Sequence, residues 1–229
     1  MWYWCGISHG MKKIILCSNI HSQRDANHLI QNIDYVRTLF GSDVPVYVSS
    51  NGLDTIGGLQ KNVTFRKFKP SVVFENFNPL NSVLNCLRML AEEFVGDLSE
   101  YNIIYVHPDL YVYNMSKLLP LLDDLEEYDF VCRNYVGPDW RGQEYRDLWQ
   151  GVNYYMTEDF LVAGRVIDRF KTIPYDSIKS TDELPFNVHE MKFASVIDND
   201  LGLKVKRIDI MRNGDHEDNE MGFWHDHKH

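Results

Sequence analysis

The 229-residue sequence lacks the features that mark several common classes of protein. No run of apolar residues approaches the ~20 that are needed to cross a bilayer, so we expect no membrane span. The chain has only 8 prolines and 14 glycines and no low-complexity segment or internal repeat, which argues against extensive disorder. Its four cysteines show no paired spacing, which argues against a disulfide framework or a zinc cluster. The expected compartment is therefore the reducing cytoplasm.

Positive charge and glycine-rich motifs are scarce as well. Lys and Arg number 23 against 33 Asp and Glu, which gives a formal net charge of -10. A general binder of the nucleic-acid backbone would be expected to be basic. No GxGxxG motif follows the first expected strand, and no GxxxxGK motif occurs anywhere. Dinucleotide-binding proteins of the usual type and P-loop proteins are therefore disfavoured.

The patterns that are present predict an α/β domain. Hydrophobic residues make up 44% of the chain and aromatic residues 13%, which is enough for one compact core. Runs typical of strands occupy the stretches 12–19, 44–52, 63–68, 101–106, 129–133, 151–156 and 205–210. Apolar residues at helical spacing occupy the stretches 26–40, 81–95, 115–127 (begun by Ser116), 157–170 and 190–201. We expect a single domain over 12–229, with a mostly parallel central sheet flanked by helices, and an N-terminal extension over 1–11.

The first fifty residues carry the clearest local signals. Ser22-x-x-Asp25 has the spacing of a capping box at the start of a helix, and Gly41 is suited to end that helix. Strands with short connections lie on either side of it. This β–α–β order predicts adjacent parallel strands with a right-handed crossover.

The chain is organised around the stretch from Tyr101 to Asn114. Its first part is a strand-like apolar run that ends at Val106, and His107-Pro108-Asp109 follows directly. Because proline removes a hydrogen-bond donor from the ladder, the strand must end or bend there. An imidazole and a carboxylate are thereby placed at the carboxyl edge of the expected sheet, where ligands bind in open α/β sheets. The alternative interpretation is an ordinary strand end at which His107 packs and Asp109 caps the turn.

This element resembles the acidic DxD motif of nucleotide-sugar-dependent glycosyltransferases of the GT-A fold, with His107 at the first acidic position. The order of a helix, a buried strand and His-Pro-Asp is similar too. The resemblance implies transfer of a sugar from a nucleotide-sugar donor, above all a UDP-sugar, to an acceptor hydroxyl. It also implies a Mn²⁺ or Mg²⁺ ion held mainly by Asp109 and assisted by His107. The strand-end residues expected near the nucleotide are Ser18, Asn19 and Asn51.

The same resemblance gives candidates for the catalytic base. Many inverting GT-A enzymes carry a carboxylate in the first turn of the helix before the last strand, and Glu190 occupies that place here, with Asp182 as its rival. The helix dipole alone also favours an acidic residue in a first turn, so a purely structural role for Glu190 stays open.

The last residues, 216–229, carry four of the nine histidines. Some retaining GT-A families bind the metal through a late histidine in an H-x-x-G-x-x-K-P-W pattern. This tail has Gly222 and Trp224 but a different spacing and no Lys-Pro-Trp. The resemblance therefore implies His225 or His227 as a further metal ligand, and the alternative is an acidic, histidine-rich tail that binds metal without specificity.

Several alternatives remain at this point. A nucleotidyltransferase of similar architecture would normally show a G-x-G-T-R-like loop after the first strand, and that loop is missing. A non-catalytic carbohydrate- or partner-binding domain is a further possibility. The acceptor can be a glycan, a protein, a small molecule or a hydroxylated DNA base. The DNA base would require a local basic groove built from Arg133, Arg141, Arg146 and the Lys/Arg cluster in 204–212.

Overall fold

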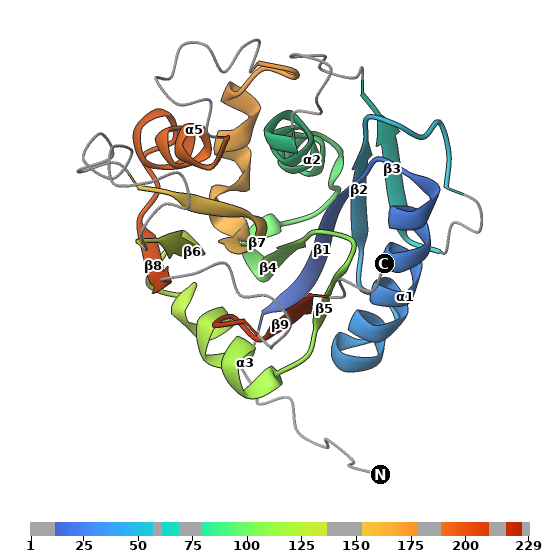
Figure 1. Ribbon diagram of the computed structural model, residues 1–229, viewed down its shortest axis with the longest axis horizontal. Coiled ribbons are helices and arrows are strands. Elements are labelled where there is room, and N and C mark those ends of the chain that lie inside the picture. Colours follow the sequence, from blue (N-terminus) through green and yellow to red (C-terminus); the bar gives the residue numbers. More distant parts are fainter. Residues whose placement is uncertain are drawn as a thin grey trace.

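A computed structural model describes residues 12–56, 61–68, 79–136, 153–177, 189–210 and 219–225. Its main sheet has seven strands in the order β3-β2-β1-β4-β7-β6-β8, and helices cover both faces. A second, smaller sheet pairs β5 with β9 (Figure 1). The expected α/β fold with helices flanking a mostly parallel sheet is therefore confirmed. None of the helices in the described part of the chain is long and apolar enough to cross a membrane.

The first half of the sheet is built from parallel neighbours. Strand β1 (Lys13–Ile20) is followed by α1 (Gln23–Phe40) and β2 (Val46–Ser50), and β3 (Val63–Lys67) forms the edge. Strands β1 and β2 pair in parallel, as the β–α–β pattern predicted, and β3 pairs with β2 in the same direction. The capping box is also present, since Ser22 accepts a hydrogen bond from the Asp25 N–H and the Asp25 side chain accepts from the Ser22 backbone.

The centre of the sheet is closed by a pairing between distant parts of the chain. After α2 (Pro79–Glu93) and a short 3₁₀ turn, η1 (Leu98–Glu100), the chain forms β4 (Tyr101–Val106). This strand lies parallel to β1, and the register places Leu16 opposite Ile104. Five of the six residues of β4 are buried, as expected for a strand covered on both faces.

Helix α3 (Met115–Asp124) follows the organising stretch, and its start differs from the prediction. Asn114, not Ser116, is the N-cap, because its side chain accepts a hydrogen bond from the Ser116 N–H at 3.1 Å. Pro120 lies inside the helix, beyond its first turn.

The second half of the sheet corrects one prediction. Residues expected to form a helix from Thr157 instead form β7 (Tyr155–Ala163), which runs antiparallel to both neighbours, β4 and β6 (Phe130–Tyr135). A 3₁₀ segment, η2 (Gly164–Thr172), comes only after it. The run Phe160-Leu-Val-Ala163 is fully buried, and a continuous apolar run of this length suits a buried strand as well as a helix. The segment forms a strand because it pairs with β4 on one side and with β6 on the other.

The chain ends the main sheet with a helical segment and an edge strand. Helix α5 (His189–Ser195) continues into a π-helical turn, η3 (Val196–Asp200), and β8 (Val205–Ile210) then pairs in parallel with β6. Both the helix and the strand were predicted. The predicted N-terminal extension over 1–11 lies outside the described residues.

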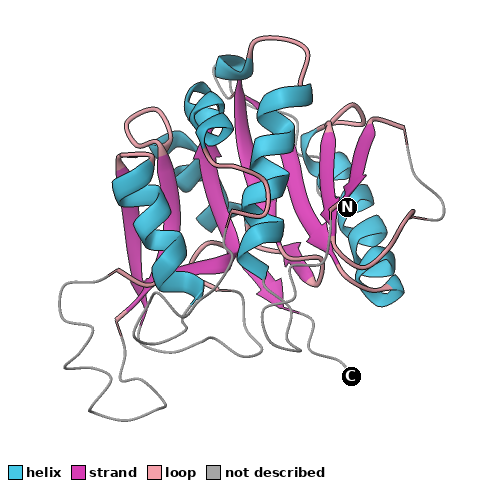
Figure 2. Cartoon of the chain, turned by 90° about the horizontal axis from the view of Figure 1, so that it is seen from above, coloured by secondary structure: helices cyan, strands magenta, loops and turns pink. Residues whose placement is uncertain are grey.

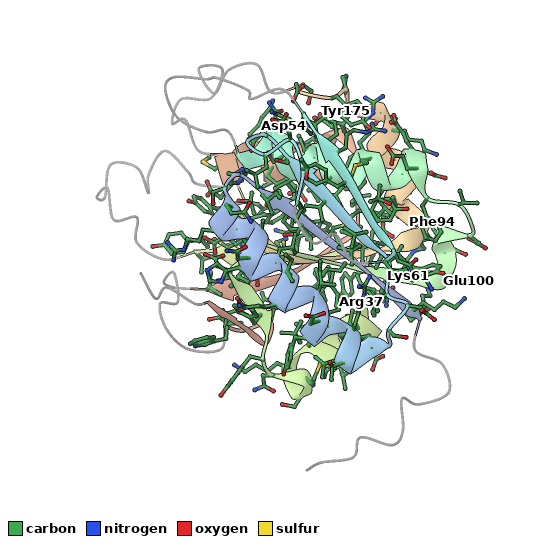
Figure 3. All side chains as sticks on the ribbon, turned by 90° about the vertical axis from the view of Figure 1, so that its right-hand side faces the viewer. Arg37, Asp54, Lys61, Phe94, Glu100 and Tyr175 are labelled. Carbon is green, nitrogen blue, oxygen red and sulfur yellow. The ribbon has the colours of Figure 1, made fainter. Side chains whose placement is uncertain are left out.

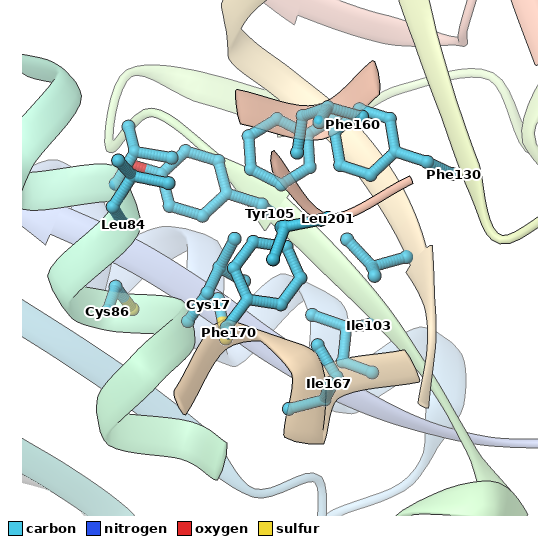
Figure 4. Close-up of a cluster of buried hydrophobic side chains, with 14 of the residues drawn as sticks. Cys17, Leu84, Cys86, Ile103, Tyr105, Phe130, Phe160, Ile167, Phe170 and Leu201 are labelled. Atoms are coloured by element: carbon cyan, nitrogen blue, oxygen red, sulfur yellow. The ribbon is translucent and has the colours of Figure 1, made fainter. Parts of the chain in front are cut away.

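Two hydrophobic cores lie on opposite faces of the sheet. Helices α2 and α5 cover one face, where Cys17, Tyr105 and Phe160 pack (Figure 4). Helices α1 and α3 cover the other face, where Leu16 and Leu161 pack. Figure 2 shows this layering of helices over strands. Neighbouring residues of one strand thus enter different cores, as the alternation of side chains along a strand requires. The cysteines Cys17 and Cys132 are buried and free, as expected, and so is Cys86.

The small sheet was not anticipated. Strand β5 (Leu110–Val112) pairs antiparallel with β9 (Phe223–His225), so that Leu110 lies opposite His225 and Val112 opposite Phe223. The tail is thus built into the fold over 219–225, and Val205–Ile210 is not the last strand. A three-residue strand carries little sequence signal, because its conformation depends on its partner.

The parallel strands of the first half of the sheet all begin on one side of the molecule and all end on the other. Figure 3 shows Lys61 and Glu100, which precede β3 and β4, on one side of the molecule, with Arg37 beside them. Asp54, which follows β2, lies on the opposite side. The carboxyl ends of β1, β2 and β4 therefore meet at the edge away from Lys61 and Glu100.

Candidate functional site

The His107-Pro-Asp109 segment forms a tight turn at this carboxyl edge. The Leu110 N–H donates to the His107 carbonyl at 3.0 Å, which closes a turn with proline at its second position, where its fixed φ is favoured. The His107 N–H donates to the Glu158 carbonyl of β7 at 2.6 Å. His107 Nδ1 lies 2.6 Å from Asp109 Oδ1, and the two side chains are 32% and 27% exposed. The strand thus ends at Val106, as predicted, and the imidazole and carboxylate form a partly exposed pair.

A second group of polar side chains lies where β1 and β2 end. The Tyr105 hydroxyl donates to Asn19 Oδ1 at 2.6 Å, and Asn19 Nδ2 lies 3.1 Å from His21 Nε2. The other ring nitrogen of His21, Nδ1, is hydrogen-bonded to Asn51 Oδ1. Because the Asn19 amide nitrogen can only donate, Nε2 of His21 accepts and the ring proton lies on Nδ1. We call Asn19, His21 and Asn51 the strand-end cluster.

The strand-end cluster holds its histidine in the neutral form. Burial lowers the pKa of His21, and the hydrogen bond from its ring to Asn51 opposes that effect only in part. Burial also raises the pKa of Tyr105 well above its ordinary value, so its hydroxyl stays a donor to Asn19. The cluster therefore presents no net charge at neutral pH.

The cluster and the turn are neighbours. The rings of His21 and His107 have centroids 6.3 Å apart and are tilted by 42°. Ser18 ties the two strands together below them, since its hydroxyl donates to the Val106 carbonyl at 2.7 Å. Ser18 and Asn19 are buried, whereas Asn51 is partly exposed. The three residues predicted to lie near the nucleotide, Ser18, Asn19 and Asn51, thus lie together at one edge of the sheet. His21 lies among them and was not predicted, because a single histidine after a strand carries no recognisable motif.

The pair of His107 and Asp109 fits part of a metal site. A hydrogen bond from one ring nitrogen to a carboxylate fixes the tautomer of a metal-binding histidine and orients its ring. Within the described ranges, however, no three His, Cys, Asp or Glu residues come together as metal ligands would. The backbone of His225 lies in β9 opposite Leu110, the residue after Asp109, and His227 lies outside the described residues. A ligand from the tail stays a prediction.

The structure describes only one of the two candidates for the catalytic base. Glu190 lies in the first turn of α5, a helix that packs against β7 and α2. Asp182 lies outside the described residues. A catalytic role for either carboxylate therefore stays a prediction.

A third polar group lies buried beside the turn and was not foreseen. Arg133 on β6 donates through Nε to Asp159 Oδ1 of β7 at 2.9 Å, and its Nη2 lies 3.3 Å from Glu158 Oε2. Asn219 Nδ2 donates to Asp159 Oδ2 at 2.8 Å. The Arg133 and Asp159 side chains are 3% and 0% exposed. Burial is the largest single effect and lowers the pKa of Arg133, but the charge and hydrogen bond of Asp159 together with the charge of Glu158 outweigh it, so the pKa is raised. We call Arg133, Asp159 and Asn219 the ion-pair cluster.

This cluster bears on the basic groove that a DNA acceptor would need. Arg133 is buried against a carboxylate and does not contribute to a surface groove, contrary to the expectation. Lys204 and Lys206 are paired with Glu127 and Asp124, at 2.9 and 2.5 Å. Arg141 and Arg146 lie outside the described residues.

Comparison with known proteins places the fold. No family model matches this sequence, and no curated protein matches it either. Among solved structures, the galactosyltransferase LgtC in complex with donor and acceptor sugar analogs is similar, at 16% identity and a TM-score of 0.50, over 85% of this chain and 72% of that one. The bifunctional IspDF from Campylobacter jejuni is similar at 8% identity and a TM-score of 0.50, over 86% of this chain and only 49% of that one. The chain thus has a GT-A-like fold, as the resemblance implied.

Proposed function

We propose that this chain transfers a sugar from a nucleotide-sugar donor, in the first place a UDP-sugar, to an acceptor hydroxyl. The observation that carries the proposal is the hydrogen-bonded pair of His107 and Asp109 at the carboxyl end of β4. It lies beside the strand-end cluster, at the edge where open α/β sheets bind their ligands. The similarity to a galactosyltransferase solved with donor and acceptor sugar analogs supports the proposal.

Asp109 and His107 would hold a divalent ion at this edge. The hydrogen bond between His107 Nδ1 and Asp109 leaves Nε2 as the ring atom with a lone pair to offer. Carboxylate oxygen and imidazole nitrogen together suit Mn²⁺ somewhat better than Mg²⁺. When bound, such an ion acts as a Lewis acid that stabilises the charge developing on the diphosphate leaving group.

The remaining roles fall to the residues around the pair. Asn51 is a partly exposed member of the strand-end cluster next to the place proposed for the nucleotide, while Ser18 and Asn19 are buried beneath it. Glu190 or Asp182 would take the proton of the acceptor hydroxyl in an inverting reaction. A glycan, a protein or a small molecule is proposed as the acceptor, because Arg133, which a groove for DNA would need, is buried against Asp159.

The proposal is tested by the melting temperature of the protein with UDP and other nucleoside diphosphates, each with and without Mn²⁺ or Mg²⁺. A ligand that binds only the folded state and is present at a hundred times its dissociation constant stabilises that state by about 2.7 kcal/mol. We expect a rise in melting temperature only when nucleotide and metal are present together. No change with any nucleotide at millimolar concentration would refute the proposal and favour a non-catalytic domain.

A further inference from the structure

The segment 219–225 is anchored in the hydrophobic core. Met221 and Phe223 are completely buried among the side chains on the α1 and α3 face of the sheet. Gly222 has a positive φ of 88°, and a Cβ there would lie 2.4 Å from the Asn114 carbonyl oxygen. The carbonyl of Gly222 accepts hydrogen bonds from the backbone N–H groups of Tyr113 and Asn114, each at 2.8 Å. The segment therefore fits one specific place beside β5.

Asn219 holds this segment together and fastens it. Its side-chain oxygen accepts from the N–H groups of Met221 and Phe223, each at 3.0 Å, and its side-chain nitrogen donates to Asp159. Its backbone carbonyl accepts from Lys117 Nζ at 3.1 Å. Asn219 is only 8% exposed, so water cannot readily replace these bonds.

Two consecutive residues of β7 connect this segment to the candidate site. The backbone carbonyl of Glu158 holds the N–H of His107, and the side chain of Asp159 holds Asn219. Arg133 reaches both carboxylates and so fixes the two residues relative to each other. Strand β9 also pairs with Leu110, the residue that closes the His107 turn. The turn is thus contacted by Glu158 of β7 and by β9, and Asn219 connects the segment that carries β9 to β7 through Asp159.

We propose that Asn219 is a positioning residue for the donor site. By fastening β9 to Asp159, it keeps the turn of His107 to Leu110 in the conformation that binds the metal–diphosphate group. This inference rests on the proposed function, but the coupling of Asn219 to the turn has a readout of its own.

The test compares Asn219→Ala with Asn85→Ala. Asn85 is a matched control, because it is also buried, at 2%, and also fastens a loop through its side chain, with bonds of 2.9 and 3.1 Å to Asp176. Asn219→Ala loses three side-chain hydrogen bonds and Asn85→Ala loses two. At ~2–4 °C for each lost bond in a chain of this size, we expect the melting temperature to fall by roughly 6–12 °C and roughly 4–8 °C, respectively. If Asn219→Ala does not fold, the test uses Asn219→Ser in its place, because serine keeps a side-chain oxygen.

Two measurements then separate positioning from mere stability. Hydrogen exchange of the His107 and Leu110 amides should speed up by about tenfold in Asn219→Ala and stay unchanged in Asn85→Ala, since local opening governs exchange. The dissociation constant of UDP with Mn²⁺ should rise by about tenfold in Asn219→Ala alone, measured well below the melting temperature.

Each outcome has one meaning. Unchanged exchange of the two amides in Asn219→Ala overturns the inference, whether or not nucleotide binds. Faster exchange with unchanged nucleotide affinity also overturns it, because the turn then binds donor without being positioned. Absence of nucleotide binding in the unsubstituted protein refutes the proposed function instead, and the exchange measurement still decides the coupling.

Discussion

Two polar clusters lie at the same edge of the sheet and are built from opposite chemistry. The strand-end cluster consists of neutral amides and a neutral imidazole, and part of it faces solvent. The ion-pair cluster contains a full positive and a full negative charge, which are almost completely buried. A buried charge is tolerable only while its partner is present, whereas a neutral, partly exposed group can exchange water for a ligand. The comparison separates a cluster that holds the fold from a cluster that borders the site.

The largest effect is expected from breaking the ion-pair cluster. Asp159→Ala removes the carboxylate nearest to the buried Arg133 and leaves the more distant Glu158, and loss of one partner of a buried pair costs about 3–5 kcal/mol of stability. Asp168→Ala is the matched control, because its bond to Lys171 is exposed and worth at most about 1 kcal/mol. Urea denaturation measures both. Equal losses in the two variants would mean that the cluster is not what holds this part of the fold.

The next effect concerns the turn beside the strand-end cluster. Asp109→Asn keeps the shape and removes the charge, so turnover should fall by roughly a hundred- to a thousandfold, which corresponds to ~3–4 kcal/mol in the activation barrier. The free energy of unfolding should change by less than about 1 kcal/mol. Activity with a UDP-sugar and the melting temperature are measured on the same sample. A less stable variant with undiminished affinity for nucleotide and metal would show instead that Asp109 only caps the turn.

A smaller effect is expected where α1 supports the strand-end cluster. Asp25 Oδ2 accepts from the N–H groups of His21 and Ser22, at 2.9 and 3.0 Å. Asp25→Ala should therefore cost about 1–2 kcal/mol of stability and loosen His21. Gln23→Ala, an exposed change in the same turn, should stay within about 0.5 kcal/mol. Urea midpoints of the two variants check this, and identical midpoints would contradict it.

The smallest effect is a pH dependence that only the neutral cluster should show. The pKa of His21 is lowered in the folded protein by burial, so the unfolded chain takes up a proton more readily. The contribution of His21 is fully present above its unfolded pKa of about 6.5 and is lost as the pH falls toward the lower folded value. His21→Gln should thus lose less stability between pH 7.5 and 5.5 than the unsubstituted protein. If the free energy of unfolding changed with pH by the same amount in the two proteins, the lowered pKa of His21 would be refuted.

Local patterns were sufficient to predict much of the fold. The capping box at Ser22 and Asp25, the parallel pair β1–β2, the buried strand ending at Val106 and the helix–strand pair α5–β8 were all predicted correctly. Each is specified by residues close together in the sequence. Strand β7 was predicted wrongly, because its apolar run around Phe160 fits two periodicities and only its neighbours β4 and β6 select one.

The site was predictable only where its residues were adjacent. His107 and Asp109 lie two positions apart, and the structure does bring them together. Arg133 and Asp159 are 26 residues apart, and Asn219 lies 60 residues beyond Asp159, so no spacing rule connects them. Their association is a property of strand order in the sheet, which the sequence does not state locally.

The pairing of β1 with β4 has a consequence for the synthesis of the protein on the ribosome. The two strands that meet at Ser18 and Val106 are 88 residues apart, so β1 leaves the ribosome long before its central neighbour. At about 5–20 residues per second, the interval lasts several seconds. Throughout it, one side of β1 is an open row of N–H and C=O groups, which can pair with another nascent chain. We therefore expect that side of β1 to need shielding, for example by a chaperone, until β4 has been synthesised.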